Sequence, residues 1–124
     1  MGYEAAPHAL GDYVRWMTNE YGRRPIYITE NGVCDNTPPV DGVVNDETRI
    51  DLQRGFLAGL HGAIQDGCDV RAYYQWSLMD NFEWAFGYSK RFGMVWTDFE
   101  TQARIPKASA AFFSGIARRN GLDA

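Results

Sequence analysis

Hydrophobic residues recur along this chain with two different spacings, one typical of helices and one typical of strands. In residues 7–20 the apolar side chains are three or four positions apart, which predicts a helix with one apolar face formed by Leu10, Tyr13, Val14 and Met17. In residues 26–29 apolar, β-branched and aromatic residues follow one another directly, which predicts a short buried strand.

The same succession is predicted again further along the chain. After a loop over residues 34–45, rich in Asp, Asn, Gly and Pro, residues 46–66 have the pattern of a long helix with Asp46 as its N-cap. One side of this helix is expected to be lined by Ile50, Leu57, Leu60 and Ile64. Residues 70–76 have the composition of a second strand.

The remaining residues predict shorter elements. Residues 80–87 are expected to form an irregular aromatic loop, and residues 94–98 and 103–105 a β-hairpin. A final helix is expected over residues 107–120, where Gly121 ends it.

This order of elements predicts an α/β fold with two parallel strands. In such folds the active site lies at the C-terminal ends of the strands, so the residues that follow both strands are expected at one mouth. Two strands cannot close a barrel or bury both faces of a parallel sheet. Residues 1–124 are therefore expected to be part of a larger domain, without an internal domain boundary.

Composition and charge exclude several classes of protein. The chain has 124 residues, 45% hydrophobic, and its net charge of −4 offers no basic surface to nucleic acid. No apolar run approaches transmembrane length and no signal-peptide pattern is present, so we expect no membrane partner. For Cys34 and Cys68 free thiols are favoured over a bridge, which is typical of a cytoplasmic protein. We expect neither a metal site nor a cofactor.

Two acidic residues are candidates for chemistry. Glu30 directly follows the first strand, although a glutamate there is often only a solvated loop acid. Glu83 lies between Phe82 and Trp84, with Trp76 a few positions earlier. Aromatic faces beside a carboxylate suit a sugar, whose C–H faces pack on rings and whose hydroxyls donate to carboxylate oxygens. The alternative is an aromatic corner with one exposed acid.

Several long stretches, in the correct order, resemble glycoside hydrolase family 1, the β-glucosidases and their relatives. YITENG at residues 27–32 resembles the nucleophile motif of that family, and WSLMDNFEW at residues 76–84 resembles its glycone-binding motif. Further family-like segments are found at residues 46–50, 63–71, 87–93 and 101–107.

The resemblance implies a (β/α)₈ barrel, with residues 26–29 as strand seven and residues 70–76 as strand eight. It implies that Glu30 is the nucleophile of a retaining β-glycosidase acting on a β-glucoside or a related sugar. It further implies that the glycone is bound by four residues: Trp76, Glu83, Trp84 and Phe92. On this resemblance Glu83 is a binding residue and not the general acid.

The general acid/base motif of the family, Thr-x-Asn-Glu-Pro, has no counterpart in this sequence. The segment Thr18-Asn19-Glu20-Tyr21 resembles it only superficially, because it lacks the proline and ends a predicted helix. We therefore expect a C-terminal barrel portion that is inactive alone. It would be a gene fragment, a half that assembles with the N-terminal barrel portion, or a non-catalytic remnant. A small sugar-binding module is the alternative from another class.

Overall fold

The computed structural model describes residues 4–122, and the order of its elements is the predicted one. It contains α1 (Ala9–Tyr21), β1 (Ile26–Asn31), α2 (Glu47–Gln65), β2 (Val70–Gln75), η1 (Trp84–Phe86), β3 (Val95–Thr97), β4 (Arg104–Pro106) and α3 (Ala108–Arg119). Within the described residues no helix has the length and apolar character needed to cross a membrane.

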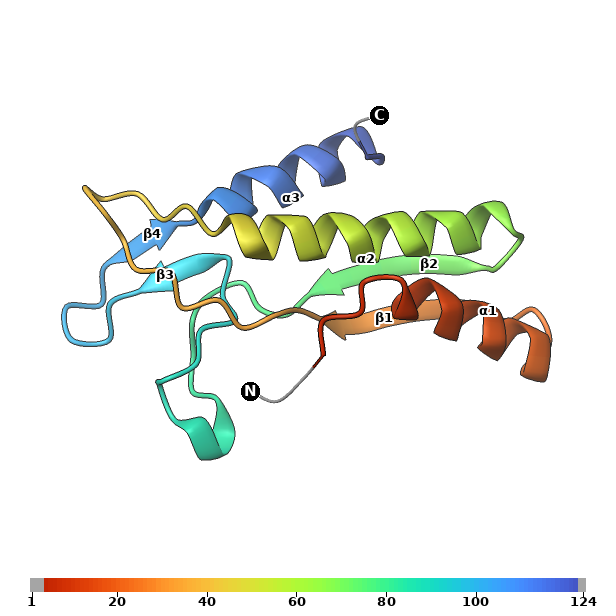
Figure 1. The fold of residues 1–124 in the computed structure, drawn as a ribbon, viewed down its shortest axis with the longest axis horizontal. Helices are drawn as coiled ribbons and strands as arrows, with labels where there is room; N and C mark the ends of the chain where they lie inside the picture. The colour runs from red at the N-terminus through yellow and green to blue at the C-terminus, as the bar shows by residue number, and fades with distance from the viewer. Residues whose placement is uncertain (1–3, 123–124) are drawn as a thin grey trace.

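The central unit is a pair of parallel strands connected by α2. β1 and β2 pair from Ile26 opposite Val70 to Asn31 opposite Gln75, with irregularities in the register. Both arrows in Figure 1 point toward the end of the molecule where β3, β4 and the loop containing η1 lie. Within residues 4–122 the sheet consists of these two strands, so each strand has one outer edge without a partner strand.

The hydrophobic core lies between the helices and this sheet. Its buried residues are Val14, Leu60, Ala63 and Cys68, and partly buried residues from α1, β1 and β2 pack around them. α1 approaches α2 closely at Gly11, where a Cβ atom would collide with the carbonyl group of Gly59. The absence of a side chain at Gly11 lets the two helix backbones come together.

Two of the predicted apolar stripes are only partly correct. Tyr13 is 57% exposed and stacks on Trp16 with ring centroids 5.6 Å apart, so it lies outside the core. Ile64 is 41% exposed, while Ala63 beside it is fully buried. The buried side of α2 is therefore rotated from the predicted one.

Asp46 occupies the predicted N-cap position of α2, but its side chain does not cap the helix. Its buried carboxylate instead accepts hydrogen bonds from Arg49 Nε at 2.8 Å and from the backbone N and Oγ of Ser109 at 2.9 and 2.6 Å. Asp46 therefore joins the start of α2 to the start of α3.

The predicted β-hairpin is confirmed. β3 and β4 are antiparallel, with Thr97 opposite Arg104. Asp98 shapes the connecting turn, because its carboxylate accepts the backbone N–H groups of Glu100 and Thr101 at 2.9 and 3.0 Å.

The close helix contact predicts opposite effects for two matched substitutions. Gly11→Ala is expected to lower the free energy of unfolding by about 1–3 kcal/mol, because the added methyl group meets rigid backbone. Gly59→Ala places its Cβ 3.5 Å from the nearest atom. This substitution is expected to raise the free energy of unfolding by up to about 1 kcal/mol, because alanine has the higher helix propensity. Denaturant unfolding measures both, and equal effects of the two variants would contradict the contact.

Candidate functional site

Glu30 and Trp76 lie at the same end of the parallel strand pair. Glu30 is the second-last residue of β1, and its side chain is exposed. Trp76 directly follows β2 and donates its backbone N–H to the carbonyl of Asn31 at 2.9 Å. The prediction that both residues lie at one mouth of the fold is confirmed.

The two strand ends touch each other tightly. A Cβ atom at Gly32 would collide with the carbonyl oxygen of Trp76, so only glycine fits there. The hydroxyl of Tyr73 donates to the side-chain oxygens of Asn31 at 2.8 Å and Gln75 at 3.1 Å. Burial raises the pKa of Tyr73, so the hydroxyl remains a donor across the neutral range. These contacts fix Trp76 relative to the end of β1.

The aromatic loop extends in the structure over residues 80–92, beyond the predicted end at residue 87, and presents Glu83 and Trp84. The backbone carbonyl of Glu83 accepts a hydrogen bond from the N–H of Phe86 at 2.8 Å, and its backbone N–H donates to the carbonyl of Gly87 at 2.7 Å. These two bonds close the short turn of η1. Trp84 is 82% exposed, and its φ of 43° lies in the left-handed region. The loop therefore holds a large indole ring in solvent, while Glu83 beside it is half-buried.

Phe92 lies between the two strand ends. Its carbonyl accepts hydrogen bonds from the backbone N–H of Ser77 at 3.0 Å and from Arg49 Nη1 at 2.8 Å. Its side chain lines a hollow of about 500 Å³ together with residues of the segment after β1, among them Gly32, Val33 and Cys34. Of the predicted site residues, Phe92 thus connects the two strand-end segments.

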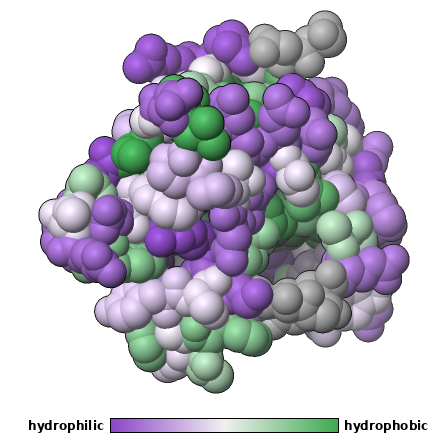
Figure 2. Space-filling model, turned by 60° about the vertical axis from the view of Figure 1, so that its left-hand side comes forward, coloured by the Kyte–Doolittle hydropathy of each residue, from purple (hydrophilic) through white to green (hydrophobic). Residues whose placement is uncertain are grey.

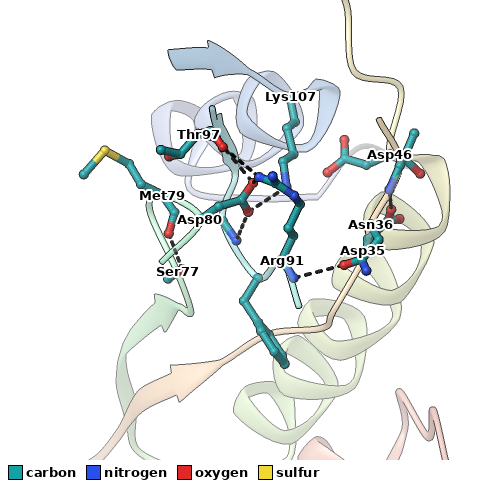
Figure 3. A network of polar contacts seen from close by, with 12 residues as sticks. Asp35, Asn36, Asp46, Ser77, Met79, Asp80, Arg91, Thr97 and Lys107 are labelled. Atoms are coloured by element: carbon teal, nitrogen blue, oxygen red, sulfur yellow. Dashed lines mark hydrogen bonds and ion pairs between the residues drawn. The ribbon is translucent and has the colours of Figure 1, made fainter. Parts of the chain in front are cut away.

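A buried ionic cluster supports the aromatic loop (Figure 3). The carboxylate of Asp80 accepts Arg91 Nη1 at 2.6 Å, Lys107 Nζ at 3.0 Å and the backbone N–H of Gly93 at 2.9 Å. The guanidinium of Arg91 also lies 3.4 Å from the centroid of the Trp96 ring. Asp80 and Lys107 have fully buried side chains, so the first and last parts of the loop are held from inside the protein.

Burial and a neighbouring cation lower the pKa of Lys107 below its ordinary value. Burial lowers the pKa of Lys107, the charge of Arg49 lowers it further, and the hydrogen bond to Asp80 opposes both. Sequence reasoning did not identify Asp80, Arg91 or Lys107 as functional, because their partners are 11 and 27 residues apart. The available signal was an acid, Asp80, that directly follows the two apolar residues Leu78 and Met79.

The face of the molecule that carries these loops exposes large apolar and aromatic side chains, among them Leu78, Phe82 and Trp84. Figure 2 shows hydrophobic and hydrophilic side chains mixed across it. A second hollow of about 300 Å³ lies elsewhere, between α2, β2 and α3, and is lined by Leu60, Tyr73 and Phe113 among others. Within residues 4–122, no group of three His, Cys, Asp or Glu side chains is arranged to hold a metal ion.

Comparisons with known proteins agree on one family. Residues 1–122 match the family described as glycosyl hydrolase family 1. The 1,4-β-D-glucan glucohydrolase of Thermotoga neapolitana is 44% identical over 98% of this chain, and β-glucosidase 4 of Oryza sativa is 46% identical over 87% of it. The solved family 1 β-glucosidase of Thermotoga maritima superposes on the whole chain with a TM-score of 0.96 and 42% identity.

These relatives are much longer than this chain. It spans 28% of the Thermotoga neapolitana protein, 23% of the Oryza sativa protein and 28% of the solved Thermotoga maritima chain. Thermotoga maritima structures have been solved with sugar-like molecules, among them a cyclophellitol analogue described as a transition state mimic and isofagomine lactam.

The ionic cluster predicts that removal of the charge of Asp80 strongly destabilises the fold. Asp80→Asn is expected to lower the free energy of unfolding by about 3–5 kcal/mol, because it leaves the fully buried Lys107 and the partly buried Arg91 without their carboxylate. Asp98→Asn is the control, since the hydrogen bonds of this turn carboxylate go to backbone N–H groups of the hairpin turn, and we expect a small effect there. Denaturant unfolding of both variants checks this, and an equally small effect of Asp80→Asn would contradict it.

Proposed function

The chain belongs to glycosyl hydrolase family 1, and on that premise we propose that it is the C-terminal portion of a retaining β-glycosidase of the β-glucosidase type. Such an enzyme hydrolyses terminal β-D-glycosyl residues. The observation that carries the proposal is the position of Glu30 and Trp76 at the same end of two parallel strands. The two strands correspond in this proposal to strands seven and eight of a (β/α)₈ barrel.

Glu30 is the nucleophile of the proposed reaction. Its carboxylate oxygen attacks the anomeric carbon, the bond to the leaving-group oxygen breaks, and a covalent glycosyl-enzyme forms. Water then attacks the same carbon and releases both the sugar and the carboxylate. The exposed position of Glu30 at the end of β1 supports this role. The proton for the leaving group comes from a general acid in another segment, the N-terminal barrel portion.

The glycone is bound by residues after β2. Trp76, 36% exposed, offers an indole face on which the C–H face of the sugar packs. Glu83 accepts hydrogen bonds from outer hydroxyl groups, and the exposed Trp84 donates its indole N–H to another. Phe92 forms part of the wall, next to the hollow that it lines.

The partner of this chain is the remainder of the barrel. The outer edges of β1 and β2 expose unpaired N–H and C=O groups, which act as templates for further strands. The chain also spans only 28% of its Thermotoga relatives. We therefore propose that the chain works with the N-terminal barrel portion, and that the chain alone is inactive. The cytoplasmic location inferred from the two thiols stays a prediction.

The nucleophile is tested in a completed barrel. This chain is combined with the part of the Thermotoga maritima β-glucosidase that it does not match, and hydrolysis of an aryl β-glucoside is measured. Glu30→Gln is expected to abolish turnover, a loss of several orders of magnitude, because the amide cannot form the glycosyl-enzyme.

Glu20→Gln, an exposed acid of α1, is the matched control and is expected to keep full activity. Near-normal turnover of Glu30→Gln would exclude it as nucleophile. Binding of glucose without any turnover by the completed barrel would favour a sugar-binding module instead.

The glycone site is tested in the same assembly. Glu83→Ala is expected to weaken transition-state stabilisation by about 2–5 kcal/mol, because sugar hydroxyls lose a charged acceptor. The loss should be smaller for deoxy substrates that lack the contacted hydroxyl, as comparison of kcat/KM across substrates shows. Glu100→Ala, on the exposed hairpin turn, is the control. Equal losses for glucosides and deoxyglucosides would exclude a direct contact.

A further inference from the structure

Arg49 makes an unusual set of hydrogen bonds for a side chain on a helix. It lies in the first turns of α2, and its side chain is fully buried. Its guanidinium donates to one carboxylate oxygen and four backbone carbonyl oxygens: Asp46 Oδ2 at 2.8 Å, Val33 O at 2.7 Å, Phe92 O at 2.8 Å, Asp35 O at 3.2 Å and Arg91 O at 3.0 Å. Each of its three nitrogens is used.

The four carbonyls belong to two segments that are far apart in the sequence. Val33 and Asp35 follow β1 and therefore follow Glu30. Arg91 and Phe92 are the last residues of the aromatic loop after β2. Arg49 is 14 and 16 residues from the first pair and 42 and 43 residues from the second. One side chain thus holds both strand-end segments at once.

Two of these carbonyls also accept backbone hydrogen bonds, one that joins the two segments and one within the segment after β2. The backbone N–H of Asp35 donates to the carbonyl of Arg91 at 3.0 Å, and that of Ser77 donates to Phe92 at 3.0 Å. Ser77 follows Trp76 directly. A movement of the Phe92 carbonyl is therefore passed on to the residue beside the proposed sugar platform.

The geometry requires arginine. A guanidinium is planar, remains charged, and has five N–H donors in a fixed fork, whereas a lysine ammonium has three donors on a flexible stem. Asp46 orients the fork through Nε and balances its charge, and Ser109 holds Asp46 in turn. We call Arg49 with its four carbonyl partners the clamp. Asp46 and Ser109 anchor this clamp on the starts of α2 and α3, inside the protein.

We propose that Arg49 is a positioning residue that sets the distance between the nucleophile segment and the glycone-binding loop. The inference rests on the proposed function for its meaning in catalysis, but the clamp itself is a property of this chain. The hydrogen bonds of Arg49 to the two segments all go to backbone carbonyls. It acts through the backbone of the two segments.

The first test measures hydrogen exchange in the 124-residue chain without any sugar. In Arg49→Lys the backbone amides of Asp35 and Ser77 are expected to exchange about 10–100-fold faster, because buried carbonyls lose charged donors. Amides inside β1 and β2 are expected to keep their rates. Arg54→Lys is the matched control, since Arg54 lies on the same helix, is exposed, and pairs with Asp51. A uniform increase across the whole chain would show a purely structural role and overturn the proposal.

A second variant keeps the test decisive if Arg49→Lys does not fold. Asn36 forms an exposed tie between the same segments, because it accepts the N–H of Arg91 at 3.0 Å and donates to the carbonyl of Ser89 at 2.8 Å. Asn36→Ala is expected to speed exchange at Arg91 while Asp35 and Ser77 stay protected by Arg49. Release of all three amides in Asn36→Ala would contradict a clamp at Arg49.

The consequence for catalysis is measured in the completed barrel. Arg49→Lys is expected to lower kcat/KM for an aryl β-glucoside about 100-fold, mainly through kcat, since small misplacements of reacting groups are costly. Faster exchange at Asp35 and Ser77 with an unchanged kcat/KM would overturn the positioning role. Absence of turnover in the unsubstituted assembly would instead count against the proposed function, and the exchange pattern would still report on the clamp.

Discussion

Two buried carboxylates, Asp46 and Asp80, must be paired with cations, and the arrangement of the loops depends on this requirement. An isolated charge in the interior is very costly, whereas a paired and hydrogen-bonded one is tolerated. Asp46 is paired with Arg49, and Asp80 with Arg91 and Lys107. Through these pairs and the further hydrogen bonds of their members, segments are connected that the strands and helices by themselves would leave free.

The two ends of the molecule are therefore stabilised by different forces. Around α1, α2 and the sheet, the core consists of small and aliphatic side chains such as Val14, Leu60 and Ala63. At the carboxyl ends of β1 and β2 the chain has little regular structure, and buried polar contacts hold it in place. A polar network of this kind fixes one geometry, because moving any member leaves a buried donor or acceptor unpaired. That property suits a site in which a nucleophile and a sugar platform have to remain in register.

In contrast to the loops, whose buried polar groups are paired, the two-stranded sheet has outer edges without partner strands. β1 and β2 pair with each other, and within the described residues neither has a partner on its outer edge. The chain belongs to glycosyl hydrolase family 1 and spans 28% of its Thermotoga relatives, and in the function we propose these edges are the places where a barrel continues. In the function we propose, the chain contributes a nucleophile and a glycone platform, and the acid that protonates the leaving group comes from the other side of that barrel.

The sequence by itself determined the order of the elements, the parallel pair and the place of Glu30 and Trp76, because periodicity and strand composition depend on residues only a few positions apart. The tertiary structure decided which polar residues are buried. Asp46 has the sequence pattern of an N-cap, yet it binds Ser109, 63 residues later. Tyr13 fits an apolar stripe, yet it lies in solvent on Trp16. The carbonyls around Arg49 carry no sequence signal at all, since every residue has one. Only the folded chain brings such distant groups together, and their burial then decides which of them must be paired.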